Sequence, residues 1–198
     1  MADALLLAAF PPELGGLDAA PPPGWQVALT GVGAVAAAVA TARLLAERRP
    51  SRVLFVGTCG AYDERLAVGA LLSAAEVLAV SQDERLGRAY RPGVEVARWL
   101  ATWELPLPGH VVAVTPAITT DLEGARRLGE VAAAEHLELS GVFAACHAAG
   151  VPVAGALGVA NRVGPGAHAE WRLHHAAVSR ALLAALAPVL GARPVPGP

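Results

Sequence analysis

Residues 135–164 read EHLELSGVFAACHAAGVPVAGALGVANRVG and carry the clearest structural signals in the chain. After a short acidic and polar segment, an apolar run over residues 142–149 is typical of a helix, and it stops at Gly150, a residue type that commonly ends helices. The apolar run over residues 151–160 is typical of a buried strand. A helix that leads into a buried strand favours an α/β fold.

Two polar side chains stand at the ends of these predicted elements. Glu138 precedes the helix, and Asn161 directly follows the strand. In open α/β sheets, ligands bind in the crevice outside the carboxyl ends of the strands. We therefore expect the carboxylate and the carboxamide to face one cleft, where a ligand would bind.

The length of the chain favours a single domain over residues 1–198, with a frayed tail at residues 191–198. The chain is long enough to bury a sizeable core, and a composition of 55% hydrophobic and 16% charged residues excludes a disordered protein. The net charge is −2 without a long run of one sign, and aromatic residues make up only 5% of the chain. Nucleic-acid binders usually show a basic face or a stacking platform, so we expect no nucleic-acid partner.

The sequence shows no signal for export or for the membrane. The N-terminal segment lacks a basic region and reaches Pro11 and Pro12 after a short apolar run. The longest apolar run, over residues 27–42, is interrupted by Gly and Thr and falls short of the ~20 residues needed to cross a bilayer. We expect a soluble, cytoplasmic protein without membrane contact.

Metal, redox and serine-hydrolase chemistry find little support in the sequence. Cys59 and Cys146 are too few for a disulfide framework, and we interpret them as small, buried hydrophobic residues. None of the six histidines stands in a tight ligand motif with cysteine or a carboxylate, so neither a metal nor a cofactor is expected. Ser140 does not stand in the G-x-S-x-G pattern of a serine-hydrolase elbow.

The rest of the chain alternates between strand and helix patterns. Strands are predicted over residues 4–10, 25–29, 52–56, 66–80 and 111–114, and helices over residues 34–47, 94–103, 121–134 and 169–190. The charged segment 82–92 is predicted to be a loop. This alternation predicts an α/β domain with a central mixed, mostly parallel sheet flanked by helices.

Polar or glycine-rich segments follow most of the predicted strands, and such strand ends meet at one edge of a parallel sheet. Glu13 follows the first strand, and the other segments are residues 30–33, 57–60 and 115–120. Apart from Glu13 and Glu138 these positions are uncharged, which suits a neutral, polyhydroxylated ligand better than a phosphate. Taken alone, the position of Glu13 rather fits an acid in a solvated loop.

Four short motifs resemble those of the nucleoside phosphorylase/nucleosidase superfamily. In chain order they are GVG before the Ala-rich helix, VGTCG at residues 56–60, EHLE at residues 135–138 and GVANRVG at residues 158–164. Each motif alone is weak, but their order, spacing and placement at strand ends extend over nearly the whole chain. Within the superfamily, the pattern is most similar to that of the futalosine hydrolases, which release hypoxanthine from a nucleoside in the alternative menaquinone pathway.

The resemblance implies a role for each matching residue. Glu13 would position and activate the attacking water, Glu138 would accept hydrogen bonds from the ribose hydroxyls, and Asn161 would meet N7 of the leaving purine. An amide at this last position suits a 6-oxopurine, because its carbonyl accepts the N7 proton and its NH2 group can donate to O6. The other implied substrate contacts are His136, Leu137, Thr58, Cys59, Gly60, Ile118 and Thr119.

The same resemblance favours water over phosphate as the attacking group. Phosphorylases place arginines around a phosphate beside the glycine turns, whereas residues 54–56, which lead into Gly57, are Leu, Phe and Val. Leu157 stands where the nucleosidases often carry Arg. Without Arg or Lys, a dianion in this pocket would be poorly compensated.

The sequence thus predicts an N-ribosyl hydrolase of a purine nucleoside, with futalosine as substrate and dehypoxanthine futalosine and hypoxanthine as products. A purine nucleoside phosphorylase, a methylthioadenosine/S-adenosylhomocysteine nucleosidase and a non-catalytic nucleoside-binding paralogue remain alternatives. The family commonly forms oligomers in which a neighbour completes the pocket, so a homo-oligomer, dimer or larger, is expected. Residues 82–103, with Tyr90, Trp99 and Trp103, form a candidate contact surface, and these aromatic residues fit a core position at least as well.

Overall fold

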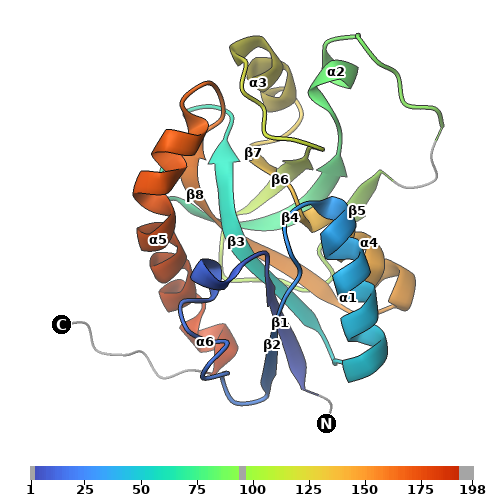
Figure 1. Ribbon diagram of the computed structural model, residues 1–198, viewed down its shortest axis with the longest axis vertical. Helices are drawn as coiled ribbons and strands as arrows, with labels where there is room; N and C mark the ends of the chain where they lie inside the picture. Colours follow the sequence, from blue (N-terminus) through green and yellow to red (C-terminus); the bar gives the residue numbers. More distant parts are fainter. Residues whose placement is uncertain (1–2, 94–96, 192–198) are drawn as a thin grey trace.

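The structure, a computed structural model, describes residues 3–93 and 97–191 of the chain. These residues form one eight-stranded sheet with helices on both of its faces (Figure 1). The expected α/β class with a central mixed sheet is therefore confirmed. Of the predicted frayed tail, all but Gly191 lies outside the described residues, and so do residues 94–96 of a predicted helix.

The sheet is mixed, and five of its eight strand pairs are parallel. The strand order is β2-β1-β3-β7-β6-β4-β5, and β8 pairs with both β3 and β4. The strands are β1 (Ala4–Ala8), β2 (Trp25–Leu29), β3 (Val53–Ala61), β4 (Leu71–Ala79), β5 (Arg98–Leu100), β6 (Gly109–Val114), β7 (Ala134–His136) and β8 (Val153–Arg162). The long parallel pair of β3 and β8 is buried almost throughout, which explains why both strands read as apolar runs.

The helices form two layers. In Figure 1, α1 and α4 cover one face of the sheet and α5 covers the other. The helices are η1 (Pro11–Leu14, a 3-10 turn), α1 (Ala34–Arg48), α2 (Gln82–Arg85), α3 (Leu122–Gly129), α4 (Leu139–Ala149), α5 (Ala167–Ala185) and α6 (Ala187–Leu190). Among the described residues, none of the helices combines the length and apolar character that a membrane span requires.

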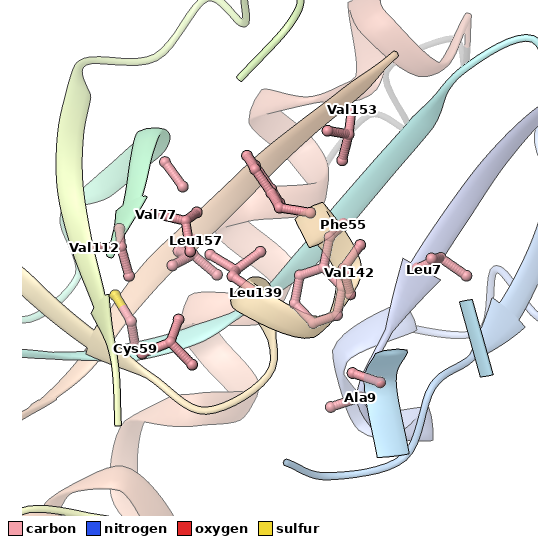
Figure 2. Packing of buried hydrophobic residues seen from close by; sticks show 14 of the residues in the cluster. Leu7, Ala9, Phe55, Cys59, Val77, Val112, Leu139, Val142, Val153 and Leu157 are labelled. Carbon is pink, nitrogen blue, oxygen red and sulfur yellow. The ribbon is translucent and has the colours of Figure 1, made fainter. Parts of the chain in front are cut away.

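Each face of the sheet has its own buried core. On one face, Leu139 and Val142 of α4 lie against Phe55 of β3, as Figure 2 shows. On the other face, Leu182 of α5 and Leu186 pack against side chains of the central strands that point to this face, such as Leu54 of β3. Because side chains alternate along a strand, β3 and β8 contribute to both cores, and they hold the two helical layers in a fixed relation.

Helices α1 and α4 cross at very close range. A Cβ atom built on Gly141 would lie only 2.0 Å from the carbonyl oxygen of Ala34, so no other residue type fits there without moving a backbone. The many alanines of α1 have small side chains, which let the two helices stay close along the rest of their contact. This crossing brings the start of α1, at Gly33, beside the start of α4, at Glu138.

Strand β3 is longer than the sequence predicts. The segment 57–60, expected to be a turn after a strand over residues 52–56, continues the strand to Ala61. These residues are small, yet they pair in parallel with β8 along their whole length, and the pairing supplies the backbone hydrogen bonds that a turn would otherwise need. Tertiary pairing therefore outweighs the turn preference of glycine here.

The helix predicted over residues 94–103 is wrong where the structure describes the chain. Residues Arg98–Leu100 form β5, antiparallel to β4, with Trp99 directed to the core and its neighbours more exposed. That alternation has the period of a strand, but three residues are too few to reveal it in the sequence. The predicted loop over residues 82–92 contains the short helix α2, which Ser81 and Glu84 begin with a capping box.

The helices predicted over residues 121–134 and 169–190 are shorter or divided. Helix α3 ends at Gly129, and the Asp121 carboxylate caps its start by accepting a hydrogen bond from the Gly124 amide. The last helix is split into α5 and α6 near Pro188, which has no N–H for an intrahelical hydrogen bond.

Cys59 and Cys146 are free and buried, as predicted, and burial raises the pKa of the Cys146 thiol to about 12. Trp99 and Trp103 pack against the cores, whereas Tyr90 is 87% exposed. The two tryptophans therefore fit the core interpretation.

Candidate active site

A cavity of about 460 Å³ opens where several strands end at one edge of the sheet. Its volume lies in the range of small-molecule sites, roughly 300–1,000 Å³. The lining residues are Ala9, Phe10, Glu13, Val32, Thr58, Cys59, Gly60, Ile118, Glu135, His136, Leu137, Glu138, Asn161, Ala167, His168 and Trp171. They come from segments that follow β1, β2 and β6, from β3, from β7 and its turn into α4, and from β8 and α5. This is the crevice expected for an open α/β sheet.

Glu13 is buried, with only 4% of its surface exposed. Pro11 and Pro12 begin the 3-10 turn η1 directly after β1, and Gly15 ends it in the left-handed conformation, so the turn folds Glu13 back over the strand ends. Its Oε1 accepts hydrogen bonds from the Thr58 amide (2.8 Å) and hydroxyl (3.0 Å), and its Oε2 accepts one from the Ala9 amide (3.3 Å).

Burial raises the pKa of the Glu13 carboxyl to about 7, although the Thr58 and Ala9 hydrogen bonds act in the opposite direction. The negative charge of Glu138 adds a smaller upward contribution. A carboxyl group with this pKa can exchange a proton near neutral pH, which is the property of a general base. The interpretation of Glu13 as an acid in a solvated loop is therefore wrong.

Glu138 is also buried and is anchored by its neighbours. Its Oε1 accepts a hydrogen bond of 2.8 Å from the Gly33 amide, at the start of α1. Gly33 has a φ of 92°, a conformation that other residues rarely adopt, and this turn aims its N–H at the carboxylate. Part of the acceptor capacity of Glu138 remains free towards the cavity.

His136 lies between the carboxylates as a neutral ring. Its Nδ1 accepts hydrogen bonds from the amides of Glu138 (3.1 Å) and Leu139 (3.3 Å), so the ring proton resides on Nε2. Nδ1 also lies 3.3 Å from Oε2 of Glu138, but burial lowers the pKa of the ring, which disfavours an ion pair there. Nε2 approaches Gly57, beside Oε1 of Glu13.

Asn161 reaches the cavity from the end of β8. The register of β3 and β8 shifts between Cys59 and Gly60, so that Gly60 lies opposite Asn161 and Ala160 is the extra residue of a β-bulge. The Asn161 amide nitrogen donates to the Arg162 carbonyl at 2.9 Å. This contact fixes the amide, and Oδ1 remains an acceptor.

Glu135 is a further buried carboxylate in the lining. Thr119 donates to it through its amide (3.0 Å) and its hydroxyl (2.5 Å), and the Tyr62 hydroxyl donates at 3.1 Å. With three donors, this carboxylate is largely occupied and is suited to holding the turn before α4 in place.

Nine of the ten site residues expected from the sequence line the cavity, and Thr119 lies behind it as a donor to Glu135. Sequence reasoning missed Phe10, Glu135, His168 and Trp171. Glu135 was part of a quoted motif, Trp171 lies in the helix predicted over residues 169–190, and His168 lies one residue before it. Nothing in the sequence, however, showed that this helix faces the strand ends.

The lining contains no Lys or Arg among the residues that the structure describes. Arg162, next to Asn161, instead donates from its guanidinium to the Asp63 carbonyl. The described part of the chain also holds no group of three or more His, Cys, Asp or Glu arranged for a metal ion.

The family model of the phosphorylase superfamily matches residues 26–138, more than half of the chain. The chain belongs to the phosphorylase superfamily. The expected superfamily is thereby confirmed, although a comparison with curated protein sequences finds no match.

Solved structures share the fold of this phosphorylase-superfamily protein. The Helicobacter pylori futalosine hydrolase superposes with a TM-score of 0.83 at 16% identity, covering 96% of this chain and 99% of its own. The 5′-methylthioadenosine/S-adenosylhomocysteine nucleosidase of H. pylori gives 0.82 at 16% identity, with 96% and 98% covered. That of Neisseria meningitidis gives 0.78 at 18% identity, with 96% and 99% covered.

Proposed function

We propose that this protein is an N-ribosyl hydrolase that cleaves the N-glycosidic bond of a purine nucleoside. One observation carries this function: Glu13, a buried carboxyl group with a pKa near 7, lines the same cavity as Glu138 and Asn161. Such a cavity offers separate groups for a water molecule, a sugar and a leaving base. Membership in the phosphorylase superfamily supports the same class of substrate.

Glu13 and Asn161 would serve the two ends of the breaking bond. The water oxygen bonds to C1′ while the bond from C1′ to N9 of the purine breaks, and the Glu13 carboxylate takes a proton from that water. The purine departs with the bonding electrons and gains a proton from solvent at N7, where Oδ1 of Asn161 accepts the resulting N–H. A positioned acid or base of this kind is worth about 10²–10⁴-fold in rate.

Glu138 would bind the ribose hydroxyls with the acceptor capacity that Gly33 leaves free. His136 is proposed to donate from Nε2 to a water or hydroxyl beside Gly57, since its Nδ1 is already occupied. The remaining proposed contacts are Leu137, Thr58, Cys59, Gly60, Ile118 and Thr119.

Water is favoured over phosphate because the described lining offers no cationic side chain. Phosphate sites usually pair the anion with Arg or Lys, and an uncompensated dianion near Glu13 and Glu138 would be strongly disfavoured. Leu157 bears on this choice only through the resemblance, because its side chain is fully buried in the core and does not line the cavity.

Futalosine is the substrate that we propose, with hypoxanthine as the released base. The amide of Asn161 suits a 6-oxopurine, and futalosine hydrolase of H. pylori shares the fold. A 5′-methylthioadenosine/S-adenosylhomocysteine nucleosidase is the second candidate, because proteins of that name share the fold with TM-scores of 0.82 and 0.78.

The deciding experiment measures base release by chromatography. The protein is incubated with futalosine, inosine and methylthioadenosine, each with and without inorganic phosphate. We expect hypoxanthine from futalosine at a rate that phosphate does not change. Release that requires phosphate would make the protein a phosphorylase, adenine from methylthioadenosine alone would favour the second candidate, and nucleoside binding without release would indicate a non-catalytic paralogue.

We also propose that residues 1–198 form one domain that assembles into a homo-oligomer, and the expected cytoplasmic location stays a prediction. Val32, at the cavity, and Val35 and Val39 of α1 are 63–80% exposed and form an apolar surface that a second copy could cover. Light scattering should show a dimer or a larger oligomer, and Val35→Lys should weaken this association. Leu173→Lys, on the opposite layer, is the matched control, and a wild-type monomer at all concentrations would contradict the assembly.

A further inference from the structure

Trp171 of α5 is connected to Glu13 through a single side chain. The indole N–H of Trp171 lies 3.1 Å from the Thr58 hydroxyl oxygen, and this oxygen lies 3.0 Å from Oε1 of Glu13. Indole nitrogen only donates and carboxylate oxygen only accepts. When Glu13 is ionised, the direction of both hydrogen bonds is therefore fixed: Trp171 donates to Thr58, and Thr58 donates to Glu13.

The indole is held firmly in this orientation. His168 and His175, one turn before and one turn after it on α5, stack on Trp171 with centroid distances of 5.8 and 4.2 Å and interplanar angles of 16° and 13°. Phe10 approaches the indole at 5.9 Å from the turn that also carries Glu13. Two stacked rings leave the indole little freedom to rotate away from Thr58.

We propose that Trp171 is a positioning residue that directs the Thr58 hydroxyl proton to Glu13 and so holds this carboxylate ionised and in one orientation. A hydroxyl has one proton and can rotate. When the indole N–H points at its oxygen, the remaining favourable position for the proton is towards Oε1 of Glu13. This role rests on the proposed function, in which Glu13 takes a proton from the attacking water.

Loss of the indole N–H would leave the carboxylate less well supported. The Thr58 hydroxyl could then rotate away, and Glu13 would keep only the amide of Thr58 (2.8 Å) and the longer hydrogen bond from Ala9 (3.3 Å). Fewer donors favour the protonated acid, so a higher pH would be needed to ionise Glu13. The other titratable groups that face this site are Glu135, His136, Glu138, Cys59, His168 and His175.

A first experiment tests the connection without any substrate. In ¹⁵N-labelled protein the four tryptophans give four indole N–H resonances, and Trp171→Phe identifies the one from Trp171. We expect this resonance to shift with pH with a midpoint near 7, the pKa of Glu13. Glu13→Gln and Thr58→Val should each abolish that step. Protonation of His168 or His175 would also move the resonance, but that step would persist in Glu13→Gln, so the difference between the two proteins isolates the carboxylate.

A second experiment measures kcat/KM for base release against pH. Trp171→Phe keeps a ring in the stack. It should move the acidic limb of the pH profile to higher pH by about half a pH unit to one unit, the effect of roughly one hydrogen bond. Thr58→Val should move it in the same direction, and Thr58→Ser should restore it. Trp103→Phe is the matched control and should leave the limb in place, because the indole N–H of Trp103 donates to the Val53 carbonyl at the start of β3 and not to Thr58.

The two experiments separate this role from the proposed function. If the wild type cleaves no nucleoside, the hydrolase assignment fails, while the indole titration still reports the connection. If Trp171→Phe does not fold, Phe variants of Trp25, Trp99 and Trp103 identify the Trp171 resonance by elimination, and the wild-type titration still decides. An indole resonance unaffected by Glu13→Gln, or an acidic limb unmoved by both Trp171→Phe and Thr58→Val, would overturn the role of Trp171.

Discussion

Asn161 lies directly opposite Gly60 in the ladder of β3 and β8, and its amide fills the space that a side chain at position 60 would need. A Cβ atom at Gly60 would lie 2.9 Å from Nδ2 of Asn161 and 2.8 Å from Cγ2 of Val163, closer than side-chain contacts allow. The β-bulge at Ala160 creates this pairing, because it shifts the register by one residue. The position of the proposed base-reading amide therefore depends on the absence of a side chain on the neighbouring strand.

Gly60→Ala should displace the Asn161 amide and lower kcat/KM for base release by about 10–100-fold, since small displacements at a reacting group are costly. The fold should survive, because both contacts are to the ends of side chains. Steady-state kinetics and thermal unfolding of the same preparation check this result. Full activity in Gly60→Ala would show that the orientation of Asn161 is unimportant.

Glu13→Gln should abolish the water-activating base and lower base release by about 10²–10⁴-fold. In the wild type, kcat/KM should rise with pH through about 7, because only the ionised carboxyl of Glu13 can take the proton. Steady-state assays from pH 5 to pH 9 measure both effects. A flat pH profile together with an active Glu13→Gln protein would remove Glu13 from the mechanism.

Glu13→Gln should also stabilise the protein at alkaline pH. The carboxyl has an ordinary pKa of 4.5 and a pKa of about 7 in the folded protein, so between these values the folded state holds a proton that the unfolded state has released. The contribution of Glu13 to the free energy of unfolding therefore falls as pH rises from about 4.5 to about 7.

An uncharged Gln does not lose this proton. At pH 8 the variant should exceed the wild type in stability by about 1–3 kcal/mol, and at pH 4 the two should be nearly equal. Urea unfolding at both pH values checks the difference. If the difference in the free energy of unfolding between the two proteins does not grow with pH, burial does not destabilise the ionised carboxylate of Glu13.

Asn161→Asp should shift the base preference away from 6-oxopurines. A carboxylate accepts hydrogen bonds but cannot donate to O6, so the ratio of kcat/KM for futalosine or inosine to that for methylthioadenosine should fall by about tenfold or more. Both classes of nucleoside are compared with each protein. An unchanged ratio would show that Asn161 does not read the base.

Gly141→Ala should destabilise the whole domain. The added methyl group would collide with the backbone of Ala34, so α1 and α4 must separate, at a cost of about 1–3 kcal/mol or more. The matched control is Gly166→Ala, because a Cβ there meets no atom within 4 Å. Thermal unfolding of both variants measures the difference, and equal melting temperatures would contradict the close crossing.

Much of the fold could be predicted because its elements are encoded locally. The apolar run before Gly150 and the buried strand after it appear as α4 and β8, and the helix predicted from residue 121 appears as α3 with Asp121 as its cap. Errors occurred where partners distant in the sequence decide. The short strand β5 exists because β4 pairs with it, and the glycines after Val56 remain extended because β8 supports them.

The candidate site shows the same division. Nine of its sixteen lining residues could be named from the family motifs, which stand at strand ends, and parallel strands bring those ends to one edge. Phe10 and Trp171 could not, because an aromatic residue beside a predicted element has no local sign of whether it faces a core, a cavity or solvent.

The sequence by itself determined the alternation of strands and helices and placed Glu138 and Asn161 at the ends of neighbouring elements, because periodicity and capping are properties of short segments. Only the tertiary structure decided that Glu13 is buried, that Asn161 lies opposite Gly60 and that Trp171 reaches Thr58. The pKa of Glu13 and both contacts depend on atoms brought together from distant parts of the chain. The physical reason is that burial and hydrogen-bond partners are set by packing, which no single stretch of sequence contains.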